Sequence, residues 1–228
     1  MNEALRGIPN RILDLASGAL AQANMHAAFA DPSNEHWPQM SILNAAHAGE
    51  LFLKAIIASE HPLLIFKDLP TLDDKQADEL DLQMLLKRGH THDFAKLPQV
   101  LWATAGIRIP NADCYERLRL ARNAIQHFCE PDEGDLRGLS LEFIYSIIDP
   151  LMAKQFELHA IEFHEDHCVG YDYLVRTLLR REIRFSMPND FGLDEIRIAD
   201  ETRNTSADYR EWLTGALAAV GKEALFNA

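Results

Sequence analysis

Residues 38 to 60 are apolar on nearly every side when they are placed on a helix, and this segment most limits what the chain can fold into. Between Ile42 and Ala58 four polar residues interrupt it: Asn44, His47, Glu50 and Lys54. Its apolar positions are Leu43, Ala46, Ala48, Leu51, Phe52, Ala55 and Ile56. A helix that is apolar all round is normally buried, so the sequence predicts an all-α fold with this helix in its interior.

Helical spacing and boundary signals predict further helices before and after this segment. We expect them at residues 3–29, 71–88, 98–104, 112–129 and 138–164. The last of these is interrupted at Asp149-Pro150, where we expect a kink or a fresh helix start.

The chain changes character after residue 167. A basic amphipathic stretch at 171–184 is followed by a loop at 187–192 and a last helix at 208–226. Ile196 to Ile198 is a weak candidate for a short strand. These patterns predict two domains, a helical bundle at residues 1–168 and a helical C-terminal extension at residues 169–228.

Charge and cysteine content narrow the functional classes. The net charge of −13 and the pI of about 5.1 argue against broad, non-specific binding to nucleic acid or anionic membranes, although a small basic patch is compatible with them. Three cysteines, Cys114, Cys129 and Cys168, are too few for a disulfide framework and fit a reducing compartment. With no signal-peptide core and no membrane span in the sequence, we expect a cytoplasmic protein.

The most chemically specific motif is Arg122-Asn-Ala-Ile-Gln-His127, on the helix expected at 112–129. On a helical wheel Arg122 and His127 stand at the two edges of a polar arc of about 140°. Such edge positions are half-buried in a packed bundle, so we expect these side chains to line a groove beside a neighbouring helix. The alternative is a solvated helix face with no chemical role.

An arginine and a histidine at such a groove suit RNA cleavage without a metal. Histidine transfers protons near neutral pH, and arginine binds phosphate with a permanent charge. Together they could promote attack of a 2′-hydroxyl on its own phosphate, which leaves a cyclic phosphate. The 2′-hydroxyl requirement would select RNA over DNA.

The chain resembles the HEPN-domain superfamily, small helical bundles that include metal-independent ribonucleases of toxin–antitoxin and phage-defence systems. Residues 122–127 are similar to the family's Arg-polar-x3-His motif, and residues 118–121 precede it as in the family. Residues 45–55 resemble the family's buried second helix, and residues 97–101 its intermediate segment. The resemblance covers about residues 42 to 149 and implies an antiparallel helical bundle.

The resemblance also implies a homodimer in which two Arg–His pairs meet at one cleft. Arg122 would bind the phosphate, His127 would be the catalytic imidazole and Asn123 would orient them. The supporting residues would be Glu50, Arg119 and Gln126. Family members controlled by a nucleotidyltransferase antitoxin carry Tyr two residues after the histidine, whereas this chain has Cys129, which argues against control by modification there.

The chain contains two other clusters of side chains that could bind a ligand. Arg176, Arg180 and Arg184 repeat every four residues and form a candidate RNA-contacting strip, with ion pairing to acidic neighbours as the alternative. The spacing of the second cluster fits no zinc pattern, so no metal or cofactor is expected. Its members are His159, His164, His167 and Cys168.

The sequence therefore favours a metal-independent endoribonuclease that acts as a homodimer on RNA, with an antitoxin protein as a candidate partner. One alternative is a non-catalytic HEPN-like module for dimerisation or partner binding. Another places the function in the C-terminal extension. A His127→Ala variant that no longer cleaves RNA would favour the endoribonuclease over the non-catalytic module.

Overall fold

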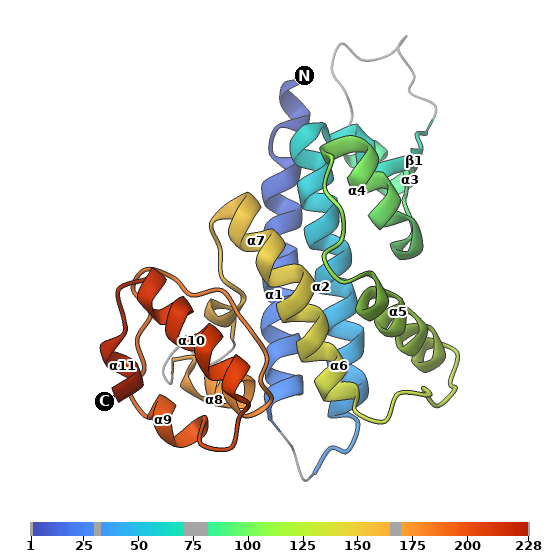
Figure 1. The fold of residues 1–228 in the computed structure, drawn as a ribbon. Coiled ribbons are helices and arrows are strands. Elements are labelled where there is room, and N and C mark those ends of the chain that lie inside the picture. The colour runs from blue at the N-terminus through green and yellow to red at the C-terminus, as the bar shows by residue number, and fades with distance from the viewer. Residues whose placement is uncertain (1, 30–32, 71–81, 165–169, 228) are drawn as a thin grey trace. The chain divides into compact units, whose positions relative to one another are not determined.

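The computed structural model describes residues 2–29, 33–70, 82–164 and 170–227 (Figure 1). The fold is all-α, as predicted, with two short strands in the part of the chain described. The helices are α1 (Ile8–Ala28), α2 (Trp37–Glu60), α3 (Leu82–Arg88), α4 (Leu97–Ala105), α5 (Ala112–Gln126), α6 (Leu136–Phe143), α7 (Asp149–Phe156), α8 (Asp172–Arg180), α9 (Ile198–Glu201), α10 (Ala207–Ala219) and α11 (Ala224–Asn227).

The chain divides into two compact units. The first, unit 1, comprises residues 1–16 and 49–109, and the second, unit 2, comprises residues 17–48 and 110–228. The helices α1 and α2 each contribute residues to both units. The predicted domain boundary near residue 168 falls within residues 165–169, outside the described part, and stays a prediction.

Unit 1 contains the two strands, which the sequence analysis did not anticipate. Strand β1 (Phe66–Asp68) pairs antiparallel with β2 (His90–Thr91). Gly89, which directly follows α3, must be small, because a Cβ there would lie 2.6 Å from the Phe66 ring. The start that we expected for that helix, at residues 71–81, lies outside the described residues.

The predicted buried helix is present as α2. Its unit 1 part carries Lys54, which is buried and donates to Glu50 Oε1 at 2.6 Å and to Thr91 Oγ1 at 3.0 Å. Glu50 and Lys54, four residues apart on α2, therefore form an ion pair. Because Lys54 also donates to Thr91 in β2, this ion pair links the short strand to α2.

In unit 2, α7 begins at Asp149, where a fresh helix start or a kink was predicted, and a π-helical turn, Ile144–Ile148, separates it from α6. Figure 1 shows α6 and α7 following each other without a loop. The expectation of helix as far as residue 164 was wrong. Helix α7 ends at Phe156, because Glu157 adopts a left-handed conformation with φ 56°. Ala160–Glu162 form a separate 3-10 turn.

Residues 170–227 also belong to unit 2 and carry their own apolar cluster. The Phe185 ring lies 6.1 Å from that of Phe191 and 5.9 Å from that of Trp212. The predicted loop at 187–192 is confirmed, whereas Ile196–Ile198 form no strand and Ile198 instead begins α9. The predicted last helix is divided into α10 and α11.

Asp149 joins three segments of unit 2. Its buried carboxylate accepts hydrogen bonds from the Ala160 backbone at 2.8 Å, the Ser186 backbone at 2.6 Å and the Ser186 hydroxyl at 2.7 Å. Burial raises the pKa of Asp149, and the donors act in the opposite direction. The π-helical turn places this carboxylate where both later segments can reach it.

We expect Asp149→Ala to lower the free energy of unfolding by about 3 kcal/mol, because three buried donors lose their acceptor. Urea unfolding followed by circular dichroism measures the change. Asp190, which is exposed, supplies the matched control, and Asp190→Ala should leave stability unchanged. An equal loss in both variants would contradict the role given to Asp149.

Candidate functional site on helix α5

Helix α5 begins as predicted and ends earlier than predicted. Asn111 caps its start, accepting from the Cys114 backbone at 3.1 Å. We expected the helix to continue to Cys129, but it ends at Gln126, because Phe128 adopts φ 59°. The Cys129 N–H then donates to Ala124 O at 2.8 Å and the Phe128 N–H to Ile125 O at 3.2 Å, the hydrogen bonds of a Schellman ending.

This ending places the motif residues differently from the prediction. Arg122 and Asn123 are half-buried, as expected of positions beside a packed face. The expectation of a half-buried His127 was wrong, since His127 is the C-cap residue and is exposed. Five residues separate Arg122 from His127, so on a helix their side chains diverge by about 140° around the axis.

The predicted supporting residues differ in their surroundings. Arg119 donates to Glu116 Oε2 at 2.7 Å on the exposed side of α5, and Gln126 is exposed. Glu50 belongs to unit 1 and bonds Lys54 there. Support of the site by these residues stays a prediction.

The predicted basic strip is divided, because α8 ends at Arg180 and Arg184 lies beyond it, and its arginines have local partners. Glu201 lies 3.2 Å from Arg176 Nε and 2.6 Å from Arg180 Nε. The Arg184 guanidinium lies over the Trp212 ring, 5.8 Å from its centroid. This pairing is the one anticipated by the alternative interpretation, although one carboxylate shared by two guanidinium groups still leaves a net positive charge.

The loop that follows α5 is strongly acidic. It runs through Glu130-Pro-Asp-Glu-Gly-Asp135 to the start of α6, where Asp135 Oδ1 accepts from the Gly138 backbone at 2.9 Å. On α5, Arg117 donates to Glu133 Oε2 at 3.0 Å and to Glu142 Oε2 at 3.0 Å. The Arg117 guanidinium is thus paired with two carboxylates, and Arg181 donates to Asp135 Oδ2 at 2.6 Å.

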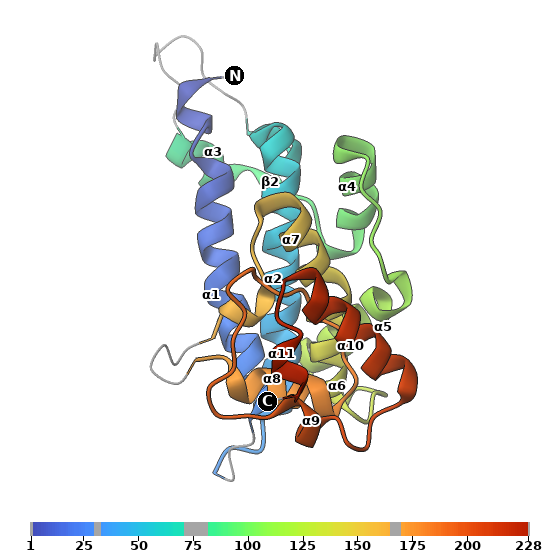
Figure 2. The same ribbon diagram turned by 60° about the vertical axis from the view of Figure 1, so that its left-hand side comes forward.

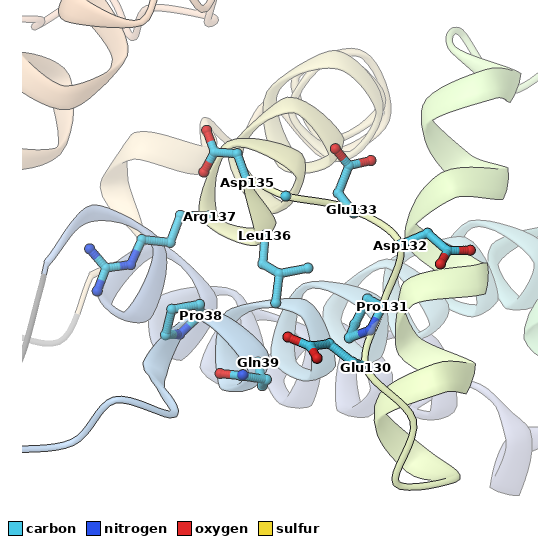
Figure 3. A pocket seen from close by; sticks show the side chains of 10 residues that line it. Pro38, Gln39, Glu130, Pro131, Asp132, Glu133, Asp135, Leu136 and Arg137 are labelled. Atoms are coloured by element: carbon cyan, nitrogen blue, oxygen red, sulfur yellow. The ribbon is translucent and has the colours of Figure 1, made fainter.

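A cavity of about 320 Å³ lies between this loop and the first turn of α2 (Figure 3). Figure 3 shows Leu136 directed toward Gln39, with the Glu130 carboxylate beside them, while three other carboxylates of the loop point outward. The carboxylates concerned are those of Asp132, Glu133 and Asp135. A second cavity, described below, lies on the α5 side of the loop.

The described residues contain no cluster of three or more His, Cys, Asp or Glu side chains able to hold a metal ion. Of the histidine–cysteine cluster weighed from the sequence, His159 Nδ1 lies 2.8 Å from Ser186 Oγ and His164 is buried. His167 and Cys168 lie outside the described residues.

Across the described ranges, no helix combines the length and the apolar character that crossing a bilayer requires. Comparisons with known protein families, curated proteins and solved structures found no match for this chain.

Sequence reasoning missed three features of this surface. The left-handed Phe128, the course of the acidic loop and the cavities that its residues line depend on where α5 stops. One signal was present in the sequence, namely five acidic or proline residues within the six positions 130–135. Such a run predicts a turn and a local negative charge, but not the surface that it borders.

The two described cysteines test the placement of α5. Burial, followed by the nearby Glu142 carboxylate, raises the pKa of the Cys114 thiol to about 12, whereas Cys129 is exposed. Because the thiolate is the reactive form, roughly one Cys114 in 10⁴ is reactive at pH 8. In a Cys168→Ser background, we expect a disulfide reagent to label Cys129 rapidly and Cys114 only after unfolding. Equal labelling rates in the native protein would contradict the burial of this helix face.

Proposed function

We propose that this protein is a metal-independent endoribonuclease that uses Arg122 and His127. The observation that carries the proposal is the position of the motif at the open end of a well-capped helix. Arg122 and Asn123 are half-buried on the last turns of α5, and His127 is exposed at its C-cap. An exposed imidazole is accessible to a polymer as large as RNA.

The chemistry follows from these two groups. The His127 imidazole takes the proton of a ribose 2′-hydroxyl as that oxygen attacks the adjacent phosphorus. The P–O5′ bond breaks, the 5′-oxygen leaves with a proton taken from water, and a 2′,3′-cyclic phosphate forms. The Arg122 guanidinium stabilises the negative charge that develops on the phosphate oxygens.

A homodimer fits the divergence of the two side chains. Since they point about 140° apart around the axis of one helix, a single α5 presents them poorly to one phosphate. When two subunits meet along α5, the arginine of one can approach the histidine of the other. The HEPN resemblance, with its composite cleft, leads to the same arrangement.

A second candidate function is a non-catalytic partner-binding module. The observation that favours it is the acidic loop 130–135, directly after the motif, which repels a phosphate backbone. Under this alternative, Arg122 and His127 have no catalytic role.

We expect His127→Ala and Arg122→Ala each to reduce RNA cleavage in EDTA by about 10²–10⁴-fold, because each removes one catalytic group. A fluorescent single-stranded RNA reports the rate, and mass spectrometry should find a 2′,3′-cyclic phosphate. His47→Ala and Arg203→Ala, at exposed positions elsewhere, are the matched controls. Full activity of His127→Ala, or a product ending in a 5′-phosphate, would move the assignment to the partner-binding module.

The composite cleft can be tested by mixing the two inactive variants. If two subunits share the cleft, a mixed dimer keeps one arginine and one histidine from different chains, so part of the activity returns. The two variants are mildly dissociated and mixed, and the RNA cleavage rate of the mixture is compared with the rate of each variant alone. No recovery, with mixed dimers demonstrated by mass spectrometry, would place both groups in the same subunit's site.

A further inference from the structure

An exposed apolar stripe runs along α5 toward the acidic loop. Leu120 is 54% exposed and Phe128 is 99% exposed, with Ala124 between them. Leu120 and Ala124 are four apart and occupy neighbouring turns of one side of α5. Phe128 follows just beyond the end of α5, at the left-handed position.

Phe128 lacks a structural reason to be phenylalanine. It is the C′ residue of the Schellman ending, with φ 59°, where glycine is preferred because a side chain adds strain. It is almost completely exposed, so burial does not offset that strain. A large aromatic side chain that costs stability and contributes nothing to the core indicates a role in binding.

Beside the stripe lies a cavity of about 290 Å³ with an apolar floor and an acidic rim. Leu120, Ala121 and Ala124 form the floor. Three acidic residues and one arginine complete the lining, namely Glu130, Asp132, Glu133 and Arg117, and Figure 3 shows the Glu130 carboxylate turned toward Gln39. Since Glu133 and Glu142 neutralise Arg117, the rim is negative.

We propose that this surface, the α5 groove, binds a basic amphipathic helical segment of a partner protein. Apolar side chains one turn apart on that segment would match the stripe, and its lysines or arginines would meet the rim. A cavity of this size is at or below the lower end of small-molecule sites, roughly 300–1,000 Å³, and suits side chains better than a cofactor.

Charge distinguishes this occupant from two others. RNA would bring phosphates against an acidic lining. A second copy docked symmetrically through the groove itself, rather than along the polar arc that holds Arg122, would bring each acidic rim against its counterpart. A basic segment is the occupant whose charge complements the groove.

The groove also adjoins the motif. His127 follows Leu120 by seven residues, two turns along the same helix side, and immediately precedes Phe128. A segment bound in the groove would therefore cover His127. This consequence, inhibition of the nuclease, rests on the proposed function, whereas the binding itself does not.

Direct binding tests the proposal without any RNA cleavage. The probe is a fluorescein-labelled Leu/Lys peptide with leucines at helical spacing, titrated by anisotropy, and a Leu/Glu peptide of the same pattern is its counterpart. We expect the Leu/Lys peptide to bind and the Leu/Glu peptide not to bind. Phe128→Gly and Leu120→Ser should each weaken binding about tenfold or more. Leu15→Ser, at another exposed leucine, should leave it unchanged.

Two charge variants separate the rim from the protein's overall acidity. The combined Glu130→Gln, Asp132→Asn and Glu133→Gln variant should weaken binding. The combined Asp190→Asn, Glu195→Gln and Asp208→Asn variant, which removes as many exposed carboxylates elsewhere, should not. Equal losses in the two variants would overturn the proposal, because they would show non-specific charge attraction.

Phe128→Gly also controls for folding. Glycine relieves the strain of the left-handed position, so the melting temperature of this variant should rise by about 2–4 °C while its peptide binding weakens. Unchanged peptide binding by this variant would overturn the proposal. The same variant is tested for binding of a fluorescent oligouridylate and, by sedimentation, for dimer formation. If it lost oligouridylate binding but kept its peptide affinity, the occupant would be RNA. If it lost the dimer but kept its peptide affinity, the occupant would be a second copy, and either outcome would overturn the proposal.

Discussion

The functional surface of this protein depends on the way in which one helix stops. The hydrogen bond from the Cys129 N–H to Ala124 O closes α5 and requires the left-handed conformation of Phe128. That ending leaves His127 at the C-cap, turns Phe128 outward and directs the chain into the acidic loop. Had the helix continued by one turn, His127 would lie on a helix side and the groove beside Leu120 would lose its acidic rim.

Two kinds of surface consequently meet at this helix end. The polar arc that contains Arg122, Asn123 and His127 suits a phosphate, whereas the groove beside Leu120 and Phe128 suits a positively charged protein segment. Both include or adjoin His127. A protein that cleaves RNA needs control of that activity, and overlap of the two surfaces at one imidazole would supply such control by steric exclusion.

Buried polar groups fix the remaining architecture of unit 2. The Asp149 carboxylate holds the segments around Ala160 and Ser186, and Asp172 accepts from the backbones of Asp194 and Glu195. Asn24 similarly donates to Ala160 O and Phe163 O and accepts from the Tyr145 hydroxyl. Each of these side chains replaces backbone hydrogen bonds that irregular segments cannot form among themselves. They explain how long irregular stretches remain ordered among short helices.

The sequence by itself determined the all-α class, the buried helix α2, the Asn111 cap and the break at Asp149-Pro150, because apolar spacing and capping chemistry act over a few neighbouring residues. It also singled out Arg122 and His127. Tertiary structure alone decided the ends of α5 and α7, the pairing of Arg176 and Arg180 with Glu201, and the exposure of Phe128. Left-handed endings at Phe128 and Glu157 carry no glycine signal, and ion pairs to Glu201 join residues more than twenty positions apart. Local propensity does not encode such contacts, which form only when distant segments pack together.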